Sequence, residues 1–107
     1  MRAPAELAEK GEGRCAVAGA LTMETAPWLW QQLQAGGLLT AAIEADLTGV
    51  TDADSAGLAL LVAWRGSCAA AGGNLIFHGL PARITALAQL TGAEAALGAD
   101  AAARAAA

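Results

Sequence analysis

The chain has 107 residues, of which 56% are hydrophobic and 15% charged, and its formal net charge is −4 at pH 7. This length suits one domain with one core, and the acidic balance disfavours nucleic acid as a partner, because phosphate binding requires a basic surface. A membrane-spanning helix is also disfavoured, since the longest apolar run, residues 56–64, is far shorter than the roughly 20 residues that cross a bilayer.

Neither the N-terminus nor the cysteines indicate export or metal binding. Residues 1–6 lack the hydrophobic core of a secretory signal, which predicts a cytoplasmic protein. Cys15 and Cys68 lie in apolar stretches, where a reduced cysteine behaves as a small buried hydrophobe. The single histidine, His78, has no companion at metal-ligand spacing. We therefore expect no disulfide, no metal site and no cofactor.

The predicted elements begin with two short strands, residues 5–10 and 14–18. Residues 11–13, Gly-Glu-Gly, join them, and these glycines permit the positive φ angles of a hairpin loop. Because a hairpin pairs its strands antiparallel, this segment predicts one antiparallel edge of a sheet.

A helix follows the hairpin. Thr25 is a plausible N-cap, Pro27 lies in the first turn, where its missing N–H costs nothing, and Gly36 ends the helix. Four residues have the spacing of a core-facing stripe, namely Ala26, Leu29, Trp30 and Leu33. Three glutamines, Gln31, Gln32 and Gln34, face water, and Trp28 lies near the edge.

Residues 41–47 predict a strand that ends at residues 48–49. Ile43, Ala45 and Leu47 alternate with Glu44 and Asp46, which places the apolar side chains on one face of the strand and the acidic ones on the other. The acidic residues therefore point to a solvated role.

The turn after this strand runs directly into the most apolar helix, predicted over residues 55–71. Asp52 and Asp54 each offer a carboxylate to the free N–H groups of the first turn, and Ser55 adds a hydroxyl where the helix dipole is most positive. Gly72 and Gly73 end the helix.

Residues 74–78 predict the last strand. Pro81 then starts a third helix, which ends at Gly92, and residues 93–97 add a short turn. Residues 99–107 are almost entirely alanine, and we expect this tail to fray or to be disordered unless other contacts stabilise it as helix. The predicted organisation is one domain over residues 1–98 and a tail over residues 99–107.

The element order is β, β, α, β, α, β, α. Helices of crossover length separate the later strands, which implies that these strands pair in parallel. The fold class is therefore α/β, with a mixed sheet of about four strands and helices packed against it.

The helix over residues 55–71 is apolar on both sides. One side is a core-facing stripe of Gly57, Leu60, Leu61, Trp64, Cys68 and Ala71. The opposite side carries Ser55, Ala59, Val62, Gly66 and Ala69, with Leu58 and Arg65 flanking it. A surface of small uncharged residues allows another backbone to approach closely, which favours partner docking; the alternative is that another part of the chain covers it.

Ser55 has two interpretations. It caps the helix, or it is a contact or phosphorylation site, where phosphate gains from the helix dipole but is opposed by Asp52 and Asp54. Catalysis is not indicated, because Ser55 has no basic partner nearby in the sequence and the chain contains neither a Gly-x-Ser-x-Gly elbow nor a phosphate-binding glycine loop. We therefore expect no catalytic residue and no enzymatic activity.

The same residues carry a resemblance to a known family. Residues 46–50, Asp-Leu-Thr-Gly-Val, and 54–58, Asp-Ser-Ala-Gly-Leu, resemble the signature of STAS domains, the fold of anti-sigma-factor antagonists. The closer resemblance is to the MlaB family, the STAS subunit of the Mla phospholipid transporter. It is carried by residues 53–61, by the Leu-Thr…Ala-Pro…Leu-Trp pattern of residues 21–30, and by residues 77–88, and it spans residues 14–97.

The resemblance implies a non-enzymatic cytoplasmic subunit, peripheral to the inner membrane, that binds the ATPase of an ABC transporter, in a complex that also holds the permease. Such a subunit supports transporter assembly and activity in maintaining outer-membrane lipid asymmetry. The partner-binding residues that we predict are Asp54, Ser55, Leu58, Ala59, Val62, Arg65 and Gly66.

Two other functions stay open. The first is an anti-sigma-factor antagonist that an anti-sigma-factor kinase phosphorylates at Ser55. Many such antagonists have two adjacent hydroxyl residues, whereas here Ala56 follows, so the switch would depend on Ser55 alone. The second is a sensor module that binds a small molecule, which has only the general fold in its favour.

Overall fold

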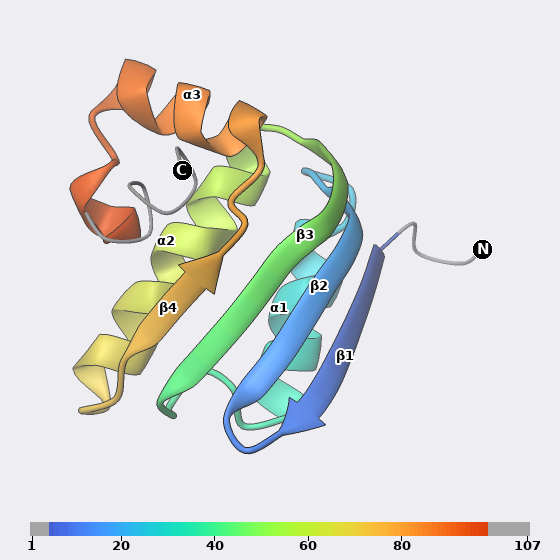
Figure 1. Cartoon of the computed structure of the whole chain (residues 1–107), viewed down its shortest axis with the longest axis vertical. Coiled ribbons are helices and arrows are strands. Elements are labelled where there is room, and N and C mark those ends of the chain that lie inside the picture. The colour runs from blue at the N-terminus through green and yellow to red at the C-terminus, as the bar shows by residue number, and fades with distance from the viewer. Residues whose placement is uncertain (1–4, 99–107) are drawn as a thin grey trace.

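The computed structural model describes residues 5–98. Four strands and three α-helices alternate in the predicted order, and a short 3₁₀ helix follows them (Figure 1). The elements are β1 (Ala5–Gly11), β2 (Arg14–Leu21), α1 (Ala26–Ala35), β3 (Ile43–Ala53), α2 (Ser55–Ala70), β4 (Leu75–His78), α3 (Ala82–Thr91) and η1 (Ala95–Leu97).

The four strands form one mixed sheet in the order β1-β2-β3-β4. β1 pairs antiparallel with β2, whereas β2 with β3 and β3 with β4 are parallel pairs. The antiparallel pair arises from the tight loop at residues 11–13, whose φ angles are all positive. The predicted α/β class, with a mixed sheet and a hairpin at its edge, is confirmed.

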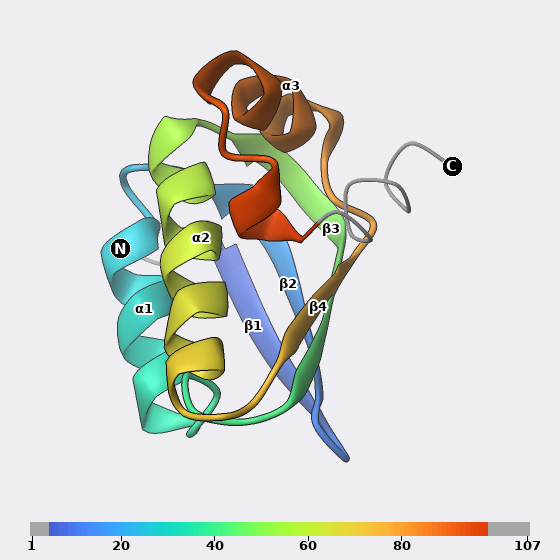
Figure 2. The ribbon, with the colours of Figure 1, turned by 90° about the vertical axis from the view of Figure 1, so that its left-hand side faces the viewer.

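The molecule has two main layers (Figure 2). α1 and α2 lie side by side against one face of the sheet, and α3 packs on α2 beyond the ends of the strands. The core lies between the layers, and its largest fully buried side chains are Trp64, Phe77, Leu21, Leu29, Leu33, Leu47, Leu61, Leu75, Ile84 and Leu97. No described helix covers the opposite face of the sheet.

β3 confirms one prediction and corrects another. Ile43, Ala45 and Leu47 are buried while Glu44 and Asp46 are exposed, as the alternation indicates. The strand, however, continues to Ala53 instead of ending at residues 48–49. The reason is pairing with the second half of β2, which also runs beyond the predicted residue 18 to Leu21; such long-range pairing overrides the turn-like local sequence.

The start of α1 is built differently from the prediction. Thr25 occupies the N-cap position, yet its hydroxyl makes no bond to the helix amides. It donates to the carbonyl oxygen of Ala20 at 2.8 Å and accepts from the Thr22 amide at 3.0 Å, so it closes the turn that precedes the helix. Leu29 and Leu33 are fully buried, whereas Trp30 is only half-buried.

The ends of the chain limit two of the predictions. The short turn at residues 93–97 exists and contains η1, with Leu97 fully buried. Residues 1–4 and the predicted alanine-rich tail, 99–107, lie outside the described residues. In α3, Ile84 and Ala88 are buried, whereas Thr91 is exposed at the helix end, where its hydroxyl donates to the carbonyl oxygen of Leu87.

Candidate functional site

The first turn of α2 is held by the carboxylate of Asp54. Its Oδ1 accepts from the amides of Ala56 at 2.9 Å and Gly57 at 3.1 Å, and its Oδ2 accepts from the Met23 amide at 3.0 Å. The bond from Met23, followed by those from Gly57 and Ala56, holds the pKa of Asp54 below its ordinary value. One side chain thus caps α2 and ties it to the loop before α1.

The neighbours of Asp54 do not share this role. Asp52 lies within β3 with its side chain exposed, and the first-turn amides donate to Asp54 instead, so the prediction that Asp52 caps the helix is wrong. Ser55 is the first residue of α2 and is exposed. The cap belongs to Asp54, which leaves the Ser55 hydroxyl at the surface.

Gly57 allows α2 to lie directly on the sheet. A Cβ added there would overlap the carbonyl oxygen of Leu21, the last residue of β2. Because backbone cannot yield as a flexible side chain can, any larger residue would push the helix away. The glycine of the Asp-Ser-x-Gly-Leu motif therefore has a packing role.

The inward side of α2 continues with Trp64 and Cys68. Trp64 is fully buried, meets Phe77 edge-on with ring centroids 5.9 Å apart, and donates its ring N–H to the carbonyl oxygen of Leu38 at 2.9 Å. The Cys68 thiol lies 3.3 Å from the same oxygen. The predicted core stripe is confirmed from Gly57 to Cys68; Ala71, its last member, is the exposed C-cap residue.

The predicted partner-binding residues lie in three different environments. Ser55, Ala59 and Gly66 are exposed, as we expected of an outward face. Leu58 is only 5% exposed and belongs to the core, so its placement on the flank of that face is wrong. α3 and η1 pack against α2, and periodicity within a single helix does not reveal such neighbours.

Val62 and Arg65 also differ from the expectation of a fully open surface. Val62 is half-buried and packs against the core. Arg65 is half-buried, and a Cβ added at Gly98 would lie 3.2 Å from its Nε. The outward side of α2 is thus partly covered where it approaches η1.

The open part of α2 faces α1. There a shallow groove of about 630 Å³ runs between the two helices. It is lined by Met23, Ala26, Pro27, Trp30, Gln31, Gln34, Ala56, Ala59, Leu60 and Ala63. None of these side chains carries a charge, and Met23 at the rim is 71% exposed. The groove is an uncharged surface bordered by alanines, which a partner helix can approach closely.

Only one residue of the groove, Ala59, belongs to the predicted site. The α1 side of the groove was not predicted from the sequence. Trp30 was the one indication of this side in the sequence. A tryptophan close to Gln31 and Gln34 on a short helix lies where the buried side of the helix meets the solvated side. A groove between two helices also depends on their relative position, which the spacing of residues within each helix does not give.

Three further observations concern residues 5–98. None of their helices combines the length and the hydrophobicity that a bilayer crossing requires. Cys15 and Cys68 are both buried, as predicted, and burial raises the pKa of the Cys15 thiol to about 11. Among these residues no group of three or more His, Cys, Asp and Glu side chains is placed to hold a metal ion.

Comparison with known proteins identifies the family. The family model described as "Mlab, STAS domain" matches residues 6–98. The chain belongs to this family. The predicted resemblance to STAS domains close to MlaB is therefore confirmed, and the Asp-Ser-Ala-Gly-Leu motif at the start of α2 lies inside the matched range. No protein with a curated description matches the chain.

A solved structure supports the fold of this STAS domain. The murine Solute Carrier 26 family member A9 (Slc26a9) anion transporter, in its inward-facing state, superposes with a TM-score of 0.65 at 14% sequence identity. The similarity covers 84% of this chain and 16% of the transporter chain. At this identity the likeness shows the fold alone, and the STAS domain spans a small part of that transporter.

Proposed function

We propose that this STAS domain is a cytoplasmic subunit that binds the ATPase of a Mla-type phospholipid ABC transporter and supports its assembly and activity. The family match over residues 6–98 is the observation that carries the proposal. In this role the domain has no catalytic activity of its own. It reaches the inner membrane only through the transporter complex, which also contains the permease, and it contributes to outer-membrane lipid asymmetry.

The groove between α1 and α2 is the docking surface in this proposal. Its ten lining residues are uncharged, and those from α2 include three alanines. Small side chains let a partner helix lie close, and an uncharged lining avoids the desolvation of fixed charges when the interface forms. Trp30 and the exposed Met23 supply the larger apolar contacts. Both residue types are common in interfaces, where aromatic residues and methionine are enriched.

Asp54 and Ser55 mark one end of this docking surface. Through Met23, Asp54 fixes the loop before α1 against the first turn of α2, so both walls of the groove start from one hydrogen-bonded point. Ser55 is exposed beside this point, and in this proposal it contacts the partner that docks on the groove. Gly66 lies farther along the outward side of α2.

The test is copurification of a tagged full-length chain from its source, followed by mass spectrometry. Recovery of an ABC ATPase and its permease is the expected result. Ala59→Arg places a long charged side chain in the groove and should abolish this recovery. Ala86→Arg is the matched control, because Ala86 is an exposed alanine on a different helix, α3, outside the groove.

Two outcomes would overturn the proposal. One is recovery of sigma-regulatory proteins without an ATPase or permease. The other is equal recovery of the ATPase by Ala59→Arg and Ala86→Arg, which would place the docking surface elsewhere. Thermal unfolding of both variants checks that the substitutions leave the fold intact, as expected for exposed positions.

The second candidate function is an anti-sigma-factor antagonist. The exposure of Ser55 favours it, because a kinase requires an accessible hydroxyl. A phosphate there would meet the N-terminal amides of α2 but also the neighbouring carboxylate of Asp54. Intact-mass spectrometry of the chain from its source tests it: one added phosphate that Ser55→Ala removes would support the antagonist, and an unmodified mass would exclude the phosphorylated form under those conditions.

A further inference from the structure

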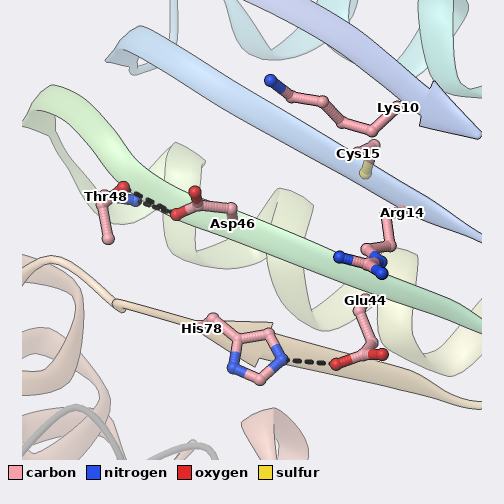
Figure 3. Close-up of a pocket in the computed structure, with 7 residues that line it drawn as sticks. All are labelled: Lys10, Arg14, Cys15, Glu44, Asp46, Thr48 and His78. Carbon is pink, nitrogen blue, oxygen red and sulfur yellow. Dashed lines mark hydrogen bonds and ion pairs between the residues drawn. The ribbon is translucent and has the colours of Figure 1, made fainter.

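The sheet face opposite the helices holds a polar hollow. This hollow has a volume of about 490 Å³, and Figure 3 shows its side chains in front of the strands with the helix ribbons behind them. Seven residues line it, Lys10, Arg14, Cys15, Glu44, Asp46, Thr48 and His78 (Figure 3). The Mla-type docking groove lies between α1 and α2, on the other side of the molecule, so the hollow is a separate feature.

The positive and negative side chains of the hollow come from different strands. Lys10 comes from the irregular end of β1 and Arg14 from the start of β2, so the cations belong to the hairpin. Glu44 and Asp46 both come from β3. Neighbouring strands lie roughly 4.8 Å apart, which places a cationic zone directly beside an anionic one.

Within residues 5–98 the two cations lack ion pairs. Glu44 turns toward β4 and bonds His78 at 2.8 Å, although its register partner on β2 is Arg14 (Figure 3). Asp46 accepts from the backbone amide and the hydroxyl of Thr48, at 2.9 and 2.7 Å, both through Oδ1. Each carboxylate therefore keeps an oxygen that makes none of these bonds, and carboxylate oxygens accept several hydrogen bonds each.

Adjacent zones of opposite charge are self-complementary under two-fold symmetry. In a symmetric dimer, if residue i of one copy meets residue j of the other, then j meets i as well. A two-fold axis between the zones sets the hairpin cations of each copy over the β3 carboxylates of the other.

We propose that the open sheet face is a self-association surface, on which a second copy of this chain docks with Lys10 and Arg14 of each copy facing Glu44 and Asp46 of the other. Exposed ion pairs are individually weak and salt-sensitive, so the dimer is weak and dissociates as ionic strength rises. The dimer leaves the groove between α1 and α2 free, so this inference does not depend on the proposed transporter function.

Sedimentation equilibrium of the full chain tests the proposal. At concentrations up to about 1 mM, where weak complexes are populated, the mass should rise from 10.6 kDa toward twice that value. Raising the salt from about 0.1 M to about 1 M shortens the screening length from about 10 Å to about 3 Å and should weaken association at least about tenfold. A monomer at all concentrations in low salt would overturn the proposal.

Two charge-reversal variants sharpen the test. Lys10→Glu with Arg14→Glu, and Glu44→Lys with Asp46→Lys, should each stay monomeric, while an equimolar mixture of the two should form a heterodimer. Failure of the mixture to associate, with both variants folded by circular dichroism, would overturn the pairing. If one variant does not fold, Lys10→Ala with Arg14→Ala replaces it and should weaken the wild-type dimer at least about tenfold.

A matched control separates local pairing from net charge. Each Glu→Lys or Asp→Lys change adds +2, so the Glu44→Lys, Asp46→Lys variant has net charge 0 instead of −4. Glu24→Lys with Glu94→Lys gives the same net charge from exposed positions outside the hollow. Because net charge near zero promotes association in general, the control should associate at least as well as the wild type, and the hollow variant less. Equal association of the two neutral variants would contradict the proposal.

Discussion

The two glycines of α2 face opposite sides of the helix, because their spacing corresponds to two and a half turns. Gly57 lies against the backbone of Leu21, so nothing larger fits between helix and sheet. Apart from the neighbouring backbone of its own helix, Gly66 has no atom within 4 Å of the position that a Cβ would occupy, so nothing in the described chain requires a small residue there. Gly57 is therefore small because the sheet packs against it, whereas no contact within residues 5–98 requires Gly66 to be small.

Substituting each glycine with alanine tests this difference most strongly. Gly57→Ala should lower the free energy of unfolding by about 3 kcal/mol, because the added methyl group meets backbone that cannot move aside. Gly66→Ala should raise it by about 0.5 to 1 kcal/mol, since alanine favours the helix and meets no obstacle. Urea denaturation measures both. Similar effects of the two changes would mean that the sides of α2 do not differ in this way.

Asp54 caps the first turn of α2 and ties it to the loop before α1. Asp54→Ala removes the acceptor of three amide bonds and should cost about 1 to 2 kcal/mol of unfolding free energy. Asp52→Ala, two residues earlier on β3, should change it by less than about 0.5 kcal/mol, because that side chain is exposed. Equal losses from both variants would restore the sequence-based expectation that the two carboxylates share the cap.

Acidification should remove the stabilisation that the Asp54 carboxylate provides. The folded-state pKa of Asp54 lies below its ordinary value, so its stabilisation is present above about pH 4 and is lost as the pH falls through the folded pKa. Hydrogen bonds from the Thr48 hydroxyl and amide also lower the pKa of Asp46, so its stabilisation should likewise be lost as the pH falls. Asp54→Asn should lose less stability than the wild type on acidification below about pH 4. Parallel pH profiles for the two proteins would show that Asp54 does not titrate in this way.

The smallest change in the free energy of unfolding is expected for Ser55, on the outward side of α2. Ser55→Ala should change the free energy of unfolding by less than about 0.5 kcal/mol, because the cap is made by Asp54 and the serine is exposed. Chemical denaturation beside Asp54→Ala gives the comparison directly. A loss as large as that of Asp54→Ala would assign the serine to the fold, and it would weaken its interpretation as a contact or modification site.

The sequence predicted the elements and their pairing because local signals agree there. The loop at residues 11–13 determined the hairpin, and alternation from Ile43 to Leu47 determined the buried face of β3. The second half of β3 was missed because its strand conformation comes from β2, which is distant in the sequence. Local pattern cannot report a partner strand when the residues themselves, such as Gly49, favour a turn.

The candidate site was predicted only in part, for a related reason. The sequence located the motif and the outward side of α2, including Ser55, Ala59 and Gly66. It placed Leu58 near the surface because a helix viewed alone does not show that α3 and η1 pack beside it. It also left the α1 wall of the groove unassigned, since two helices form a groove only once the sheet has set them side by side.

The most direct test of the proposed outward docking surface is the affinity of the purified full-length chain for the transporter ATPase, measured for the wild type, Ala59→Arg and Ala86→Arg. We expect Ala59→Arg to bind at least about a hundredfold more weakly, because a charge enters an uncharged groove, while Ala86→Arg binds like the wild type. Wild-type affinity in a folded Ala59→Arg protein would contradict the assignment of the groove as the docking surface.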